Sequence, residues 1–333
     1  DINPGILKHI AANYFKYKEN NVLIDYTDMI HQFIEKKYLC PKFDVVFIDE
    51  AQDLSPIQWM MYDILKANTK DMYLAGDDDQ AIYAWAGADV DRFIKEPAKE
   101  VVLKKSRRVP VKIQEVSNII ISRIEGLRAD KVYHPKNEQG SSIKINNLEN
   151  VDLSKDNWLI LTRTINKSIE IAKQIKQKGF LFENKYIKNF NTKLHKAAVY
   201  YSRWVDGEDL EQTQKEDVED YMSEDNWNEL VPWYEAFDNA NLEDKNYIRL
   251  LLSNKEKLTE DPRIKISTIH AAKGGECDNV ILVLDNARKI REGVLKSSKK
   301  RDEEHRVWYV GITRSKNNLY LMRAKIERHG YNL

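Results

Sequence analysis

The sequence predicts an α/β fold built on parallel β-sheet. Short apolar runs at residues 45–48, 72–75 and 280–284 are typical of strands, and the first two end abruptly at glycine or acidic residues. A continuous apolar run suits a strand that is buried on both faces of a parallel sheet. The segment 165–178 has helical apolar spacing and ends at Gly179, a favourable helix C-cap. Strands that alternate with helices indicate a parallel sheet covered by helices.

The first third of the chain predicts two strands with their helices. Residues 6–38 carry apolar side chains at three- and four-residue spacings, as amphipathic helices do. After the strand at 45–48, Ser55, Pro56 and Gln58 supply an N-cap, a proline at the first helical position and the partner of a capping box. We therefore expect a helix to begin here and to lead into the second strand.

The rest of the chain predicts a second set of strands, interrupted by an insertion. Residues 190–262 break the alternation, because they are polar, carry scattered aromatic residues and have a mainly helical pattern. Residues 289–301 are basic and predict a surface loop. The other expected elements are a short strand, basic residues and a helix within 101–113, strands at 142–146, 158–161, 263–268 and 319–322, and a helix at 303–313.

Composition limits the class of protein without naming a partner. Lys+Arg and Asp+Glu balance at 53 each, so net charge does not point to nucleic acid, although residues 206–229 are acidic and residues 288–301 are basic. The two cysteines, Cys40 and Cys277, exclude a disulfide framework and fit a reducing compartment. No apolar run approaches the length of a membrane-spanning helix. We expect a soluble, cytoplasmic protein of two or three domains with no membrane partner.

Two adjacent acids follow the first predicted strand, where open α/β sheets place their ligands. Asp49 can hold Mg²⁺ directly or through water, because this ion prefers hard oxygen ligands. Glu50 is placed to orient or deprotonate an attacking water. Gln80, after the second strand, can sense a γ-phosphate. For an isolated Asp-Glu pair, the simpler interpretation is a pair of solvated loop residues.

Four ordered motifs favour the functional interpretation. Residues 49–53, Asp-Glu-Ala-Gln-Asp, and residues 76–83, Gly-Asp-Asp-Asp-Gln-Ala-Ile-Tyr, resemble motifs II and III of the UvrD/Rep-like superfamily 1 DNA helicases. Residues 266–276 resemble motif V, and residues 303–314 resemble motif VI.

This resemblance implies two RecA-like domains. Residues 1–100 correspond to part of the first domain and contain motifs II and III. Residues 101–189 and 263–333 correspond to the second domain and contain motifs IV, V and VI. Residues 190–262 correspond to a small, mainly helical subdomain that is inserted into the second domain.

The resemblance also implies an ATP site that draws on both RecA-like domains. The implied catalytic residues are Glu50, Gln80, Arg108 and Arg314, of which the two arginines reach the γ-phosphate and stabilise charge in phosphoryl transfer. The implied residues that bind ATP and Mg²⁺ are Asp49 as the metal ligand, Arg107 stacked on adenine, Gly274 close to the ligand and Glu276 at the ribose hydroxyls.

Single-stranded DNA and duplex junctions are the partners that the resemblance implies, and protein partners are not indicated. The implied DNA-binding residues are Tyr83, Trp85, Arg163, Thr268 and His270. Aromatic faces stack on unpaired bases without sequence preference, although an isolated tryptophan more often belongs to a core.

The sequence departs from the family pattern at two positions. Ala86 stands where the family usually has arginine, so a charged link between motifs II and III is missing or is supplied from elsewhere. Gly275 replaces the usual leucine and should loosen the turn of motif V.

The sequence contains no Gly-x-x-x-x-Gly-Lys-Ser/Thr loop to cradle phosphates. We expect that the chain starts after this loop, and the other possibility is a degenerate relative that does not hydrolyse ATP. The first hypothesis for function is an ATP-dependent 3′-to-5′ DNA helicase or translocase whose 333-residue chain alone has little ATPase activity. The alternative is a non-catalytic module that binds nucleic acid or protein.

Overall fold

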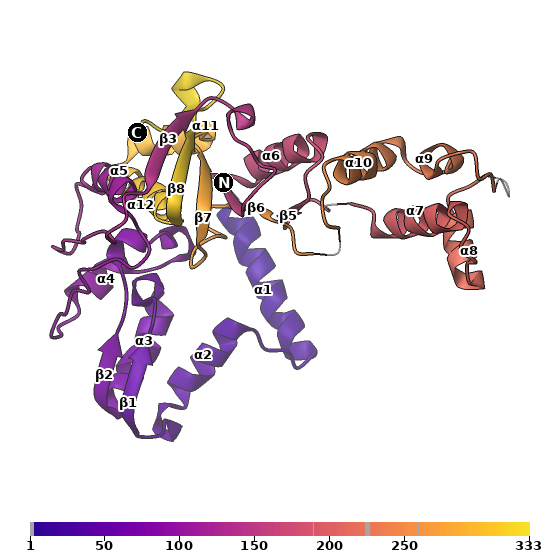
Figure 1. Cartoon of the computed structure of the whole chain (residues 1–333). Helices are drawn as coiled ribbons and strands as arrows, with labels where there is room; N and C mark the ends of the chain where they lie inside the picture. The colour runs from indigo at the N-terminus through magenta and orange to yellow at the C-terminus, as the bar shows by residue number, and fades with distance from the viewer. Residues whose placement is uncertain (1–2, 189, 224–226, 259) are drawn as a thin grey trace. The chain divides into compact units, whose positions relative to one another are not determined.

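The computed structural model describes residues 3–188, 190–223, 227–258 and 260–333. The chain divides into two units, residues 1–100 with 127–129 and residues 101–126 with 130–333. Both units contain parallel β-sheet and helices (Figure 1). The expectation of a mixed α/β protein with parallel sheets is therefore confirmed. Within the described residues, no helix is long and apolar enough to cross a membrane.

The first unit contains a two-stranded parallel sheet in which β1 pairs with β2. Asp25 and Asp28 form a capping box at the start of α2, and their carboxylates bind the buried ammonium of Lys18 from α1 at 2.9 and 2.6 Å. The elements are α1 (Pro4–Asn20), α2 (Tyr26–Glu35), β1 (Phe43–Ile48), α3 (Pro56–Ala67), β2 (Thr69–Leu74) and α4 (Val90–Lys95), with 3₁₀ turns η1 (Lys37–Leu39), η2 (Ala51–Asp53), η3 (Asp78–Gln80) and η4 (Ala84–Ala86).

The helix expected after Ser55 is confirmed. It is α3, which begins at Pro56, and the side chains of Ser55 and Gln58 form its capping box. The expectation that β1 is buried on both faces is wrong. Phe43, Val45 and Phe47 are exposed, and Phe47 stacks on Tyr73 of β2 with ring centroids 5.0 Å apart. A two-stranded sheet covers little of its own surface, so one face of β1 remains open.

The second unit is organised around a six-stranded, all-parallel sheet in the order β3-β8-β7-β4-β6-β5. Its strands are β3 (Ser141–Ile145), β4 (Trp158–Thr162), β5 (Phe182–Asn184), β6 (Ile264–Thr268), β7 (Cys277–Val283) and β8 (Ser315–Met322). Its helices are α5 (Val111–Ile121), α6 (Ile165–Gln177), α7 (Thr192–Val205), α8 (Gln212–Glu219), α9 (Trp233–Ala236), α10 (Leu242–Ser253), α11 (Arg288–Lys296) and α12 (Ser298–Ile312), with 3₁₀ turns η5 (Leu148–Asn150) and η6 (Glu327–His329).

Helices cover both faces of this sheet (Figure 1). Ile160 and Ile281 join a core cluster with residues of α6 and α10 on one face. On the other face Gly311 of α12 lies so close to Leu282 that an added Cβ would approach its side chain to 2.9 Å. All five residues of β4 are buried, as a continuous apolar strand in a parallel sheet requires.

The insertion of α7 to α10 has a core of its own, built on aromatic residues. Tyr201 is fully buried, and its hydroxyl donates to the carbonyl of Asn228 at 2.8 Å. Its ring stacks on Trp227, which meets Trp204 edge-on at 4.8 Å. Helix α10 joins this core to that of the sheet, because Ile248 belongs to one cluster and its neighbour in sequence, Tyr247, to the other.

Two further expectations are wrong. Residues 101–103 form no strand, and the nearest β pairing is an isolated parallel bridge between Lys105 and His134. Residues 289–301 are no loop, because they form most of α11 and the first turn of α12. Ile290 and Val294 are spaced as neighbours on one helix face and are partly buried, which holds the basic segment in a helix.

Two histidines, the partly buried His195 and the buried His305, should make the fold sensitive to mild acid. Burial lowers the pKa of His195 and, together with the charge of Arg123, that of His305. The unfolded chain therefore binds protons near pH 6.5 that the folded chain does not, so stability falls as the pH drops below that value. We expect His195→Asn/His305→Asn to flatten the decrease in unfolding free energy between pH 7.5 and 5.5, measured by urea titration. The exposed His31→Asn is the control, and equal slopes in both variants contradict the prediction.

Candidate nucleotide and DNA site

The acids of the first unit lie at the carboxyl end of β1. The strand ends at Ile48, and the backbone N–H of Glu50 donates to Asp49 Oδ1 at 2.8 Å. Glu50 has φ 53° and ψ 37°, the left-handed conformation that costs a non-glycine residue about 1–2 kcal/mol. Both carboxylates are on the exposed side of this turn. The strained turn directs Glu50 back toward Gln52.

Gln52 connects the ends of both strands. Its amide nitrogen donates to Glu50 Oε2 at 2.5 Å, and its amide oxygen accepts from the backbone N–H of Asp77 at 3.0 Å. Asp77 Oδ2 in turn accepts from Gln80 Nε2 at 2.8 Å. Gln52 is fully buried. A continuous hydrogen-bond chain thus joins Glu50 of motif II to Gln80 of motif III.

Gly76 makes this contact possible. A Cβ at that position would lie 2.6 Å from Gln52 Oε1 and 2.7 Å from the ring of Phe93. The glycine after β2 therefore allows the backbone to approach the buried amide.

The other two acids of motif III hold the segment 127–129. Arg128 binds the fully buried Asp79 through two nitrogens, with Nε 2.7 Å from Oδ1 and Nη2 2.9 Å from Oδ2. Asp78 Oδ2 accepts from the backbone N–H of Ala129 at 3.0 Å. Bidentate pairs of this kind are the strong, geometrically specific ones. A guanidinium thus reaches motif III from elsewhere in the chain, where Ala86 supplies none.

The two aromatic residues of motif III follow directly. Trp85 is 74% exposed on the turn η4, with its ring centroid 6.3 Å from that of Tyr83. Burial raises the pKa of Tyr83, and the negative charges of Asp53 and Glu50 raise it further. The structure therefore leaves the face of Trp85 accessible while Tyr83 lies close to the acids of motif II.

In the second unit, Arg314 is buried at the end of α12. Its Nε donates to the carbonyl of Val310 at 3.0 Å, its Nη1 to that of Gly275 at 3.3 Å and its Nη2 to Thr313 Oγ1 at 3.4 Å. A buried guanidinium needs such partners to offset its lost hydration. The structure excludes the simpler interpretation of an exposed helix arginine, since Arg314 is only 1% exposed.

Arg108 belongs to the same group of residues. Its Nη1 lies 3.8 Å from Glu276 Oε2, and Lys316 approaches the other oxygen of Glu276 at 3.7 Å. Arg108 Nε is buried and has no hydrogen-bond partner within the part of the chain that the structure describes. The structure thus brings together Arg108 and Glu276, while Arg107 points to the exposed side and Gly274 turns the chain with φ 84°.

The predicted DNA-binding residues of the second unit differ in how far their polar groups are already hydrogen-bonded or buried within the protein. Arg163 binds the buried Glu304, with Nη2 2.9 Å from Oε2, and Glu304 also accepts from Trp308 Nε1 at 2.7 Å. The hydroxyl of Thr268 is buried and accepts from the backbone N–H of Ala271 at 3.3 Å, whereas His270 is partly exposed. Their contacts to DNA stay predictions.

A metal ion at the first unit would rely on few protein ligands. Among the residues described, no group of three or more His, Cys, Asp or Glu side chains could hold one. Mg²⁺ commonly uses one or two carboxylates and takes its other ligands from water and substrate phosphates. The exposed carboxylate of Asp49 fits that chemistry.

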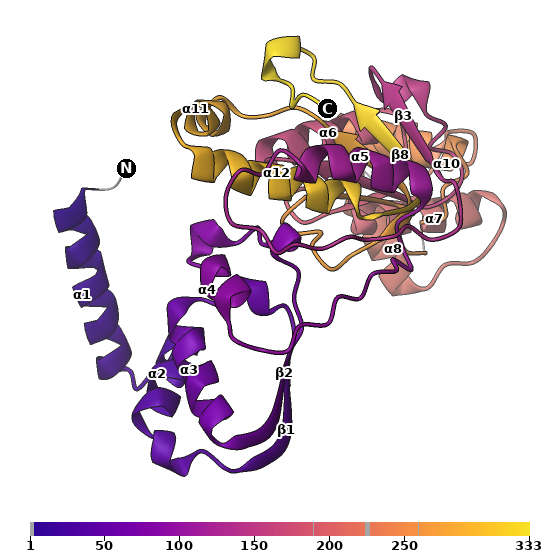
Figure 2. The same cartoon turned by 90° about the vertical axis from the view of Figure 1, so that its left-hand side faces the viewer.

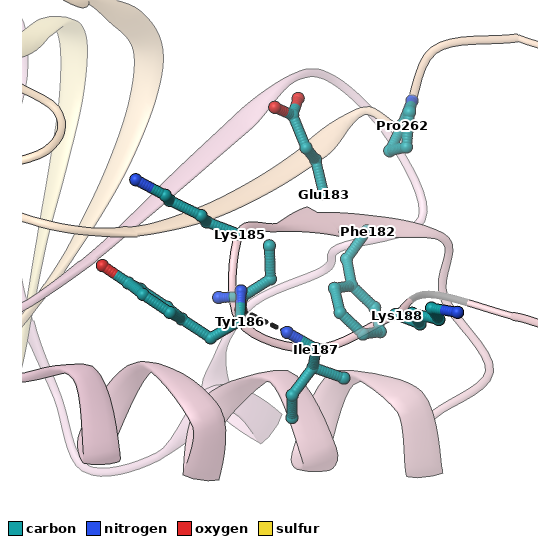
Figure 3. A pocket seen from close by; sticks show the side chains of 8 residues that line it. Phe182, Glu183, Lys185, Tyr186, Ile187, Lys188 and Pro262 are labelled. Atoms are coloured by element: carbon teal, nitrogen blue, oxygen red, sulfur yellow. Dashed lines mark hydrogen bonds between the residues drawn. The ribbon is translucent and has the colours of Figure 1, made fainter. Parts of the chain in front are cut away.

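A separate pocket of about 390 Å³ lies where β5 ends, lined by residues such as Lys185, Tyr186 and Pro262 (Figure 3). Asn184 Oδ1 shapes it by accepting from the backbone N–H groups of Tyr186 and Ile187 at 2.8 and 3.1 Å.

Parallel sheets with helices, and acidic residues at the end of a strand, define an α/β class of protein, and sequence comparison identifies the family. The profile of the UvrD/REP helicase N-terminal domain matches residues 3–99, and that of the UvrD-like helicase C-terminal domain matches residues 183–325. Together they cover most of the chain. The chain belongs to the UvrD/Rep-like helicase family.

Individual relatives are distant. The chain is 25% identical to the F-box DNA helicase protein 1 of Schizosaccharomyces pombe over 92% of the chain and 37% of that protein. It is 23% identical to the probable DNA helicase II homolog of Rickettsia conorii, over 98% of the chain and 70% of that protein. It is 25% identical to the ATP-dependent DNA helicase PcrA of Staphylococcus epidermidis over 36% of the chain and 18% of that protein. The chain thus spans little more than a third of the yeast protein.

Removal of the Gln52 amide should destabilise the first unit. Gln52→Leu keeps the size of the side chain and removes both hydrogen bonds from a fully buried position, so we expect a loss of about 1–3 kcal/mol of unfolding free energy. Chemical denaturation measures it, with the exposed Gln177→Leu as control. Equal stability of the two variants would mean that the amide contributes nothing.

Proposed function

We propose that the chain is part of an ATP-dependent DNA helicase or translocase that moves 3′-to-5′ on single-stranded DNA. The observation that carries this proposal is the hydrogen-bond chain from Glu50 through Gln52 and Asp77 to Gln80. This chain joins the Glu50 carboxylate, which can orient or deprotonate water, to the Gln80 amide, which can bind a phosphate. Trp85 follows Gln80 by only five residues.

In this proposal the first unit supplies the acids of hydrolysis. Asp49 holds Mg²⁺ together with phosphate oxygens and water. Glu50 orients or deprotonates the attacking water, and Gln80 senses the γ-phosphate. Gln52 binds both Glu50 and the backbone of Asp77, and Asp77 binds Gln80. Loss of the γ-phosphate at Gln80 therefore also changes the position of the Glu50 carboxylate.

The second unit supplies the arginines. Arg314 and Arg108 stabilise the negative charge that develops in phosphoryl transfer, Arg107 stacks on adenine, and Glu276 accepts from the ribose. The Arg108–Glu276 pair is long at 3.8 Å, and both side chains are partly exposed, so little free energy opposes its exchange for a nucleotide.

Trp85 is the strongest candidate for contact with single-stranded DNA, because its ring is exposed beside Tyr83. Thr268 and His270 are proposed to contact DNA phosphates through the turn of motif V. Arg163 is the weakest candidate for contact with DNA, because its guanidinium is already paired with Glu304.

The domain assignment is part of the proposal. Residues 1–100 belong to the first RecA-like domain, 101–189 and 263–333 to the second, and 190–262 to the insertion. The all-parallel sheet of the second unit, with helices on both faces, supports the RecA-like assignment.

A non-catalytic binding module remains the second candidate, because the 333 residues contain no phosphate-binding loop sequence. Such a module binds nucleic acid or protein without hydrolysing ATP in any context, so hydrolysis by a protein that joins this chain to a phosphate-binding loop decides between the two.

In such a protein, Glu50→Gln should abolish turnover and leave ATP affinity unchanged, because the amide keeps the size of the side chain but cannot handle the water. Arg314→Ala should lower turnover on the order of 10³-fold if it acts as an arginine finger. Nucleotide affinity and steady-state rate are measured together. The exposed Arg323→Ala is the control, and normal turnover of Glu50→Gln removes Glu50 from catalysis.

Trp85→Ala should weaken binding of single-stranded DNA about 5- to 150-fold, since stacking of one base contributes about 1–3 kcal/mol. Its melting temperature should stay near that of the parent chain, because the ring is exposed. Oligonucleotide titration and thermal melting of the same samples measure both quantities.

Two variants frame the Trp85→Ala result. Tyr38→Ala removes an aromatic ring that is 78% exposed and should not change DNA binding, whereas Trp59→Ala removes a fully buried ring and should cost about 3–5 kcal/mol of stability. A Trp85→Ala chain that melts like Trp59→Ala and binds DNA normally shows that Trp85 serves the fold.

A further inference from the structure

A concentrated basic surface lies on α11 and the start of α12. Residues 288–301 contain seven Lys or Arg and only one acid, Glu292, in a chain whose formal net charge is zero. We define the basic surface as the five exposed cations of this segment, which are Arg288, Lys289, Lys296, Lys299 and Lys300. Of these, Arg288 is paired with Glu292 one turn further along α11, with its Nε 2.7 Å from Oε1.

The basic surface is held in place by the fold. Helix α11 runs back along α12 (Figure 2), and Gly293 lies so close to Lys300 that a Cβ would contact its side chain at 3.4 Å. The guanidinium of Arg291 donates to the carbonyl of Arg328 at 2.8 Å, which fixes α11 to the C-terminal segment. Lys289 and Lys296 are seven residues apart and therefore share one helix face.

The position of Lys299 and Lys300 is unfavourable for the isolated fold. They lie in the first turn of α12, where the helix dipole is positive, and that turn contains no acid. Cations at a helix N-terminus are destabilising, while an anion there is favoured. An anionic partner relieves this repulsion, so the lysines are better explained by binding than by stability.

The chemistry of the surface distinguishes between kinds of nucleic acid. Single-strand sites combine basic grooves with aromatic rings on which bases stack, yet residues 285–303 contain no aromatic residue. Lysines alone contact phosphates and read no sequence. The aromatic pair Tyr83 and Trp85 belongs to the other unit.

We propose that the basic surface binds the phosphate backbone of double-stranded DNA, independently of sequence. The proposal rests on the proposed function for the presence of DNA, and it adds a duplex contact to the single-strand contact at Trp85.

The test replaces Lys289, Lys296, Lys299 and Lys300 with glutamine. The control replaces four exposed lysines of the same unit outside the basic surface, Lys144, Lys173, Lys193 and Lys215, so that both variants lose the same charge. Affinities for a blunt duplex and for one of its single strands are measured from low to moderate salt. Each lost phosphate contact lowers the duplex salt slope by about 0.9.

We expect the duplex salt slope of the surface variant to fall by about 3 to 4 relative to the control, with single-strand affinity matching the control. Its melting temperature should not fall, because two lysines leave the first turn of α12. Equal duplex slopes in the two variants overturn the proposal, as does an equal loss for duplex and single strand.

Other results separate this proposal from the proposed function. A parent chain that binds the single strand through Trp85 but not the duplex overturns only the duplex contact. A parent chain that binds neither form overturns both. If the surface variant instead loses self-association in sedimentation, with duplex binding intact, the surface serves contact with the acidic insertion of a second copy, and the duplex proposal is wrong.

Discussion

The arrangement of the first unit depends on the hydrogen bonds of one buried side-chain amide, that of Gln52, to the ends of two strands. Gln52 is fully buried, so both its nitrogen and its oxygen must be hydrogen-bonded, and they bind Glu50 at the end of β1 and the backbone of Asp77 beyond β2. The carboxyl ends of parallel strands meet at one edge, which brings these groups within reach. Gly76 then has no room for a side chain. The left-handed turn at Glu50 follows from the same constraint.

A buried guanidinium has a comparable part in the second unit. Arg314 at the end of α12 uses the carbonyls of Val310 and Gly275, so it fixes the turn of motif V against motif VI. The glycine at 275, expected to loosen that turn, offers its carbonyl to Arg314 and its N–H to Ala272 at 3.0 Å. Both backbone groups of Gly275 are therefore hydrogen-bonded in this turn.

Local sequence signals predicted elements well and long-range pairs poorly. The capping box at Ser55 and the apolar run of β4 carry their own information, and both were predicted. The partner of Asp79 was not, because Arg128 lies 49 residues away and no local pattern marks it. The sequence marks Gln52 only as part of a motif, because the burial of its side chain depends on both strands. The basic residues at 289–301 led to the prediction of a loop in place of α11. The helical signal here is weak, because only Ile290 and Val294 are partly buried apolar residues among many cations.

The loop that carries Trp85 is fixed at both ends by the site itself. It begins at Gln80, which binds Asp77, and it ends at Asp89, whose backbone N–H donates to the carbonyl of Leu54 at 2.9 Å, just beyond motif II. Between them Gly87 turns the chain with φ 94°, a conformation that residues with a Cβ rarely adopt. Both anchors of this loop therefore belong to the segments that hold Glu50 and Gln80. A change at either segment therefore acts on an end of the loop, and the indole between the two ends is 74% exposed. The proposed coupling between the γ-phosphate and the DNA strand requires this arrangement. The two ends of the loop are held near the acids, and an accessible aromatic ring lies between them.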